Sequence, residues 1–222
     1  MVNPMESIAL SQTHEQPPAF ARILRSRVVN LTVGVLLGAL WAYFSYRHIL
    51  AFIEHGIWGH LLYGCVETVI ALLFLCRAVP QTVSCRLTDW LIALIGTFSV
   101  SFFSPAQSGV LPSASALIFV GVALQLLALV SLNRSLAIVP AKRQIKTRGM
   151  YALVRHPMYA SHFLASTGYV LTNTTEANVA VYAIATTFLV LRIVREEKHL
   201  GADPLYRAYM DRVRYRLLPF VF

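Results

Sequence analysis

The sequence WLIALIGTFSVSFFSPAQSGVLPSASALIFVGVALQLLALVSLN, residues 90–133, decides the fold class of this chain. It contains no Asp, Glu, Lys, Arg or His over its whole length. An apolar helix needs about 17–25 residues to cross a bilayer, so this stretch is long enough for two crossings. Pro105 and Pro112 mark the turn between them, because proline lacks an amide hydrogen. We therefore predict membrane helices at about 90–104 and 112–132.

The rest of the composition also indicates a membrane protein. The 222-residue chain is 57% hydrophobic and only 13% charged, whereas a soluble domain carries about 25% charged residues. Gly34 and Gly38 form a GxxxG pattern, which permits close helix contact. The three cysteines lack the spacing of a metal site, so we expect no metal. The other apolar segments are 28–46, 57–76, 157–175 and 177–191. The fold class we predict is all-α, a polytopic membrane helix bundle of about six transmembrane helices.

The placement of positive charge predicts the orientation of the chain. If the six segments all cross the membrane, every Lys and Arg except Arg47 falls on the side that holds both termini. Cytoplasmic segments carry the excess of Lys and Arg, so we expect the N- and C-termini in the cytoplasm. We expect an integral, multi-pass protein of a bacterial inner membrane, or of the endoplasmic reticulum if the chain is eukaryotic. Its basic residues would then meet membrane lipids and not nucleic acid.

Two polar clusters stand out from this apolar background. Residues 149–159, GMYALVRHPMY, combine an Arg, a His, a Pro and two Tyr, and residues 192–197, RIVREE, follow one apolar hairpin later. The hairpin returns the chain to the same membrane surface, so His156 and Glu196 should lie near each other. Arg192 and Glu196 share a helix face because they are four residues apart. Taken singly, these side chains could also be lipid contacts, surface ion pairs or interfacial aromatic anchors.

Taken together, these residues resemble a known family. The segments 149–151, 155–159 and 196–197 are similar to motifs of the integral-membrane methyltransferases typified by isoprenylcysteine carboxyl methyltransferase, to which phospholipid N-methyltransferases are related. The resemblance covers roughly residues 133–222. One departure is Ser161, which stands where the family usually has Gly and could narrow the pocket.

The resemblance implies methyl transfer from S-adenosyl-L-methionine, with both clusters and the loop before the first one holding this cofactor. The family's arginine four residues before the glutamate holds the acceptor carboxylate, a role that falls to Arg192 here. We assign Arg192 and Arg155 as the catalytic residues. The loop residues 143–146 are assigned by spacing alone. The implied cofactor-binding residues are Arg143, Gln144, Ile145, Lys146, Tyr151, His156, Pro157, Met158, Tyr159, Glu196 and Glu197.

The acceptor that the resemblance implies is a prenylcysteine-like carboxylate or another lipophilic group. Such a small molecule or lipidated substrate would enter sideways from the bilayer. The chain then divides into a disordered N-terminal arm at 1–27, a four-helix membrane scaffold at 28–132 and a methyltransferase core at 133–222. We expect the core to hold the cofactor loop, the helical hairpin and an interfacial C-terminal tail, with the active site on the cytoplasmic side.

Two other classes of protein fit parts of this pattern. A membrane sterol or steroid-type reductase that uses NADPH resembles the chain in Arg-His-Pro-x-Tyr and in an aromatic end like residues 215–219, but the pair of glutamates favours methyl transfer. A non-enzymatic membrane scaffold or transporter subunit fits the apolar composition. It would be expected to place polar side chains along several spans, and residues 90–133 offer only Ser, Thr and Gln apart from the terminal Asn133.

Overall fold

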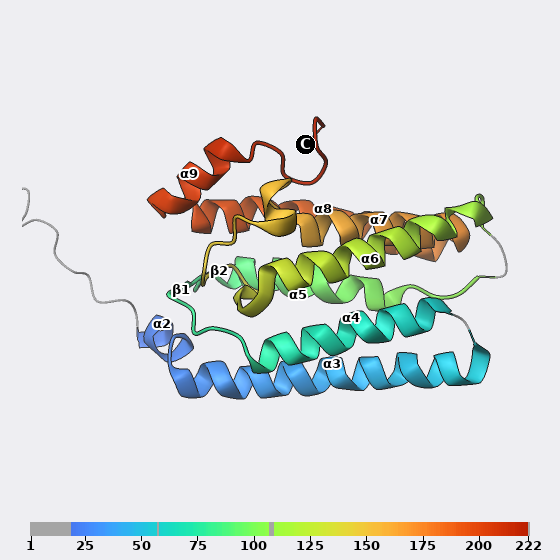
Figure 1. Ribbon diagram of the computed structural model, residues 1–222, viewed down its shortest axis with the longest axis horizontal. Helices are drawn as coiled ribbons and strands as arrows, with labels where there is room; N and C mark the ends of the chain where they lie inside the picture. Colours follow the sequence, from blue (N-terminus) through green and yellow to red (C-terminus); the bar gives the residue numbers. More distant parts are fainter. Residues whose placement is uncertain (1–18, 57, 107–108, 222) are drawn as a thin grey trace, which may run out of the picture.

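The computed structural model describes residues 19–56, 58–106 and 109–221, and within these ranges it is a bundle of long helices (Figure 1). Every apolar segment that the sequence predicts as a membrane helix contains a helix in the structure. The all-α fold class is therefore confirmed. The bundle helices are α3 (Arg27–His55), α4 (Trp58–Leu75), α5 (Leu87–Phe98), α6 (Ser115–Leu132), α7 (Pro157–Thr172) and α8 (Glu176–Leu200).

The bundle has the dimensions of an integral membrane protein. By length and composition, four helical segments can cross a bilayer: Arg27–His55, Trp58–Leu75, Pro112–Ser135 and Glu176–Leu200. α5 runs into the 3₁₀ turn η1 (Ser99–Phe102) to make a shorter apolar helix, and α7 has 16 residues. The number of crossings and the side on which the termini lie stay predictions.

Two boundaries near the N-terminus differ from the sequence prediction. α3 continues to His55, so Arg47 lies within a helix and not in a loop. Its ends are defined by local chemistry, because the Ser26 hydroxyl accepts from the Val29 amide and Gly56 takes a left-handed conformation. In the predicted disordered arm, residues 1–18 lie outside the described residues, and the remainder includes a short helix, α2 (Ala19–Leu24).

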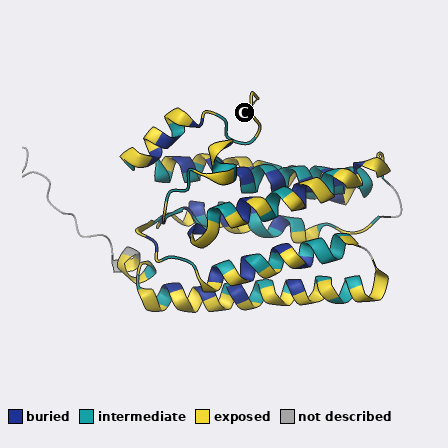
Figure 2. Ribbon diagram, viewed as in Figure 1, coloured by how far each residue is buried: buried dark blue, intermediate teal, exposed yellow. Residues whose placement is uncertain are grey.

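Small residues let the helices pack closely. A Cβ atom on Gly34 would lie 2.7 Å from the Phe74 carbonyl oxygen, so the predicted close contact at this glycine is confirmed between α3 and α4. Gly121 has the same role between α6 and α7, where a Cβ atom would lie 2.6 Å from the Ala165 amide nitrogen. Exposed residues cover the outward faces of the helices (Figure 2), and many of them are large and apolar, as in Leu36. Such an outer surface suits a lipid environment.

The two short strands lie at one end of the bundle, drawn on the left in Figure 1. β1 (Thr82–Val83) pairs antiparallel with β2 (Ala141–Lys142), so the loop after α4 is tied to the loop after α6. The sequence did not indicate this ladder. The helix α9 (Pro204–Arg212) lies at the same end, as the predicted interfacial tail requires. The remaining 3₁₀ turns are η2 (Pro112–Ala114), η3 (Asn133–Ser135) and η4 (Gly149–Ala152).

Candidate active site

The two polar clusters meet where α7 begins and α8 ends. Pro157 occupies the first turn of α7, where its missing amide hydrogen costs no helical hydrogen bond. The turn before it depends on Gly149, whose φ of +63° favours glycine and whose Cβ, if present, would lie 2.6 Å from the Ser131 hydroxyl oxygen. That hydroxyl accepts from the Met150 amide at 3.3 Å. The first cluster is thus anchored to the end of α6.

Glu197 joins the clusters through three cationic or polar partners. Its Oε1 lies 3.0 Å from Arg155 Nη1 and 3.1 Å from His156 Nε2, and its Oε2 accepts from Arg216 Nε at 2.9 Å. The side chain is only 8% exposed, and a buried carboxylate is stable only when its oxygens are well paired. Glu197 therefore holds the start of α7, the end of α8 and the C-terminal tail together.

Residues 213–216, which we call the C-terminal strap, run beside the first cluster. The Arg155 amide donates to the Tyr215 carbonyl and the His156 amide to the Arg216 carbonyl, each at 2.9 Å. A further bond runs from Arg155 Nη2 to the Arg214 carbonyl at 3.1 Å. The strap therefore fixes the backbone of residues 155–156.

Glu196 faces a different neighbourhood from Glu197. Its Oε2 accepts a 2.6 Å hydrogen bond from the Tyr159 hydroxyl, and the Arg192 guanidinium lies over the Tyr159 ring at 5.1 Å. Tyr159 therefore links the two α8 side chains that the sequence placed on one helix face. The sequence predicted that His156 lies near Glu196. In the structure His156 bonds instead to the next residue, Glu197, and it stacks on Tyr159.

The Arg192 guanidinium is fixed by two hydrogen bonds in addition to its contact with the Tyr159 ring. Its Nη1 donates to the Thr97 hydroxyl at 2.8 Å and its Nη2 donates to the Ile138 carbonyl at 2.7 Å. Its Nε has no hydrogen-bond partner among the described residues. A guanidinium has five N–H donors, so this side chain keeps donors for a ligand while its position is fixed.

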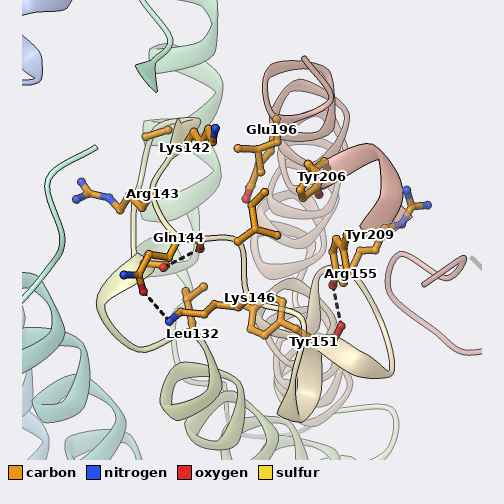
Figure 3. A pocket seen from close by; sticks show the side chains of 14 residues that line it. Leu132, Lys142, Arg143, Gln144, Lys146, Tyr151, Arg155, Glu196, Tyr206 and Tyr209 are labelled. Atoms are coloured by element: carbon orange, nitrogen blue, oxygen red, sulfur yellow. Dashed lines mark hydrogen bonds between the residues drawn. The ribbon is translucent and has the colours of Figure 1, made fainter. Parts of the chain in front are cut away.

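A cleft opens beside these contacts, between the loop after α6 and the α8–α9 end (Figure 3). It has about 480 Å³ of empty space, including the part that opens to solvent. Glu196, Tyr206 and Tyr209 lie on one side of it, and Gln144 and Lys146 lie on the loop side. The cleft thus combines a carboxylate, aromatic faces and basic side chains.

The structure brings some of the predicted site residues to the cleft and places others behind it. The predicted residues that line it are Arg143, Gln144, Ile145, Lys146, Tyr151, Arg155 and Glu196. Those that lie outside its lining are His156, Pro157, Met158, Tyr159, Arg192 and Glu197. The Arg143 guanidinium points away from the cleft and donates to the Asn30 side chain at 3.3 Å (Figure 3). Ser161 is buried, and its hydroxyl donates to the Met158 carbonyl, so it acts within α7.

The sequence analysis missed several residues of the cleft. These are Leu132, Ser135, Ala141, Lys142, Leu200, Tyr206 and Tyr209. For Tyr206 and Tyr209, the sequence did contain a pattern that could have placed them together. Asp203 caps α9 by accepting from the Leu205 amide, and residues three apart in a helix share a face. Tyr206 and Tyr209 therefore had to project together from α9.

Burial keeps the cleft tyrosines neutral. Burial and the nearby Glu196 carboxylate raise the pKa of Tyr151 and the pKa of Tyr206. Burial also raises the pKa of Tyr209, whose hydroxyl donates to the Tyr151 carbonyl at 2.8 Å. These phenols therefore serve as hydrogen-bond donors and aromatic surfaces at neutral pH, and not as bases.

Comparison with known proteins bears on the same region. Residues 114–202 match the family model of the isoprenylcysteine carboxyl methyltransferase family. Among solved structures, the chain is similar to the eukaryotic intramembrane Ras methyltransferase isoprenylcysteine carboxyl methyltransferase. The two are 20% identical, the match covers 86% of this chain and 74% of that chain, and the TM-score is 0.42. No curated protein sequence matches the chain.

The family match confirms the predicted resemblance. The matched residues include both polar clusters and the loop 143–146, and the match supports an integral-membrane methyltransferase. The strap and α9 lie beyond the matched residues, although they contact the clusters directly.

The strap contacts generate a first prediction. Arg216→Ala removes the partner of Glu197 Oε2, so the carboxylate is left poorly paired and the first cluster shifts. We expect methyl transfer to fall at least about tenfold, and we expect Arg216→Lys to restore part of it because it keeps the charge. Turnover of purified protein is the measurement. The matched control is Arg214→Ala, an exposed strap arginine, and equal losses in both alanine variants would contradict the role of Arg216.

Proposed function

We propose that this methyltransferase uses S-adenosyl-L-methionine and binds it in the cleft between the loop 143–146 and α9. The observation that supports the proposal is the cleft itself, in which Glu196 and the rings of Tyr206 and Tyr209 face basic loop residues. The family match supports it independently, because the cleft residues up to Leu200 fall within the matched region.

The donor set of the cleft fits this cofactor. S-adenosyl-L-methionine carries an ammonium group, a carboxylate, ribose hydroxyls and a sulfonium cation. The Glu196 carboxylate can accept from the ammonium or the hydroxyls, and Lys142 and Lys146 can pair with the carboxylate. The faces of Tyr206 and Tyr209 suit the sulfonium, because aromatic faces attract cations. Glu197, in this proposal, supports the site from behind and does not touch the cofactor.

The acceptor is proposed to be a carboxylate on a lipophilic molecule or a lipidated substrate that enters from the bilayer. Arg192 can hold that carboxylate through its remaining N–H donors, while Thr97 and Ile138 keep its guanidinium in place. A guanidinium forms bidentate pairs with carboxylates, which orients the acceptor oxygen. Arg155 would then act through Glu197, with which it forms an ion pair.

In the proposed methyl transfer, the main task of the protein is to position the cofactor and the acceptor. When bound, the cofactor would supply an activated methyl group. The acceptor oxygen would form its bond to the methyl carbon in line as the bond from that carbon to sulfur breaks, and S-adenosyl-L-homocysteine would leave. An acceptor carboxylate is ionised at neutral pH, so no general base is required. The side chains therefore contribute by orienting the two reactants and excluding water, and orientation alone can supply several kcal/mol.

We place this site on the cytoplasmic side of the membrane. The basic residues gather at the end of the bundle that holds the cleft, and cytoplasmic segments carry such an excess. The division into an arm at 1–27, a scaffold at 28–132 and a core at 133–222 remains our proposal. Its support is that the cleft is lined almost wholly by residues after 132.

The cofactor proposal predicts the effect of Glu196→Gln. Gln keeps an acceptor for Tyr159 but removes the charge that would pair with the cofactor. Hydrogen bonds to charged groups contribute about 1.5–3 kcal/mol, so the dissociation constant for S-adenosyl-L-methionine should rise about 10- to 150-fold. Calorimetry on detergent-purified protein measures this. Glu176→Gln, the same change at the exposed far end of α8, should bind as the unaltered protein does. Binding of NADPH in place of S-adenosyl-L-methionine would reject the proposal.

The acceptor proposal predicts a different pattern for Arg192→Lys. Lys keeps the charge but loses the bidentate geometry, so turnover with a lipophilic carboxylate acceptor should fall about tenfold or more. Binding of S-adenosyl-L-methionine should change by less than about threefold, because Arg192 does not line the cleft. Arg195→Lys, one turn of α8 away and paired with Asp89, is the control. Loss of cofactor binding with unchanged acceptor dependence would contradict the assignment.

A further inference from the structure

Two arginines, Arg77 and Arg143, lie near each other at the end of the α3–α4 pair, and the part of the chain that the structure describes gives them no counter-ion. Arg77 Nη2 donates to the Asn30 carbonyl at 3.0 Å, and Arg143 Nη1 donates to the Asn30 side chain at 3.3 Å. Neither guanidinium lies within 4 Å of a carboxylate in residues 19–56, 58–106 and 109–221. One asparagine is thus shared by two cations.

This arrangement is costly unless an anion completes it. Arg143 is only 7% exposed, and the Nε atoms of both Arg77 and Arg143 are buried without a hydrogen-bond partner among the described residues. Burial and the neighbouring Arg77 lower the pKa of Arg143 to about 10. Buried like charges repel and lose hydration, so an external anion would stabilise them.

A groove between α3 and α4 opens outward from the bundle next to these arginines. It has about 730 Å³ of empty space, including the part open to the surroundings. Its lining is Val35, Gly38, Ala39, Ala42, Ser45, Thr68, Ala71, Leu72 and Leu75. The hydroxyls of Ser45 and Thr68 bond to each other and to the Gly64 carbonyl, so the groove suits an apolar occupant.

One end of the groove lies beside Arg77. Val35 and Leu75 form one end of the groove, and Leu75 precedes Arg77 by two residues. A Cβ on Gly34, beside Val35, would lie 3.6 Å from Arg77 Nε. An occupant that begins at the arginines and continues into the groove must therefore carry an anionic head and an apolar chain.

We propose that the α3–α4 pair binds an anionic phospholipid, with its phosphate at Arg77 and Arg143 and an acyl chain in the groove. Basic pockets at the ends of membrane helices select anionic lipid head groups. A helix from a second copy of the chain would fill the groove, but it would leave the two arginines without an anion. Arg143 also contributes to the lining of the cleft, but its guanidinium points away from the cleft toward Asn30, so the lipid site does not depend on the proposed cofactor.

The experiment measures lipid binding to the full chain in detergent. Native mass spectrometry would count bound phosphatidylglycerol, and melting temperature would be followed as this lipid, phosphatidylcholine or inorganic phosphate is added. We expect phosphatidylglycerol to bind most tightly, and we expect Arg77→Gln to weaken its apparent affinity at least fivefold. Arg77→Lys should keep most of the binding. Arg86→Gln, an exposed arginine in the same loop, should bind as the unaltered protein does.

A second variant tests the groove separately from the charge. Ala39→Leu with Ala42→Leu fills the groove from α3 and should displace the lipid while leaving both arginines in place. The proposal fails if Arg77→Gln or the leucine variant binds phosphatidylglycerol normally. It also fails if inorganic phosphate stabilises the protein as well as the lipid does, or if the groove proves to be covered by a second copy of the chain.

Discussion

The structure depends on one buried carboxylate. Glu197 is 8% exposed and is paired with Arg155, His156 and Arg216. Removing such a group from water costs several kcal/mol, which only close and complementary partners can offset. Because these partners come from the start of α7, the end of α8 and the C-terminal strap, the carboxylate forces three segments into one arrangement.

That arrangement leaves the neighbouring glutamate available for a ligand. Successive residues of a helix point about 100° apart, so Glu197 turns toward the strap while Glu196 turns toward Tyr159 and the cleft. The strap also follows directly on α9, whose two tyrosines cover the cleft. The two adjacent glutamates thus have different roles. Glu197 stabilises the fold, and in our proposal Glu196 faces the cofactor.

The six bundle helices were predictable from the sequence because each lies largely within an apolar run. The meeting of the two clusters was also predictable, because a hairpin must return to the surface from which it started. What the sequence could not show was which glutamate faces the cleft, since the helix phase at this point depends on packing. The sequence also could not predict that β1 pairs with β2 or that Arg143 bonds to Asn30. Both contacts depend on segments that only the folded bundle brings together.

The central claim is that the cleft between the loop after α6 and α9 holds S-adenosyl-L-methionine. Hydrogen–deuterium exchange on the purified protein, with and without this compound, tests it most directly. If the compound binds in this cleft, residues 141–153 and 204–216 should exchange more slowly in its presence, with little change in α3 and α4. Unchanged exchange in these two segments, with protection elsewhere or nowhere, would show that the cleft does not bind it.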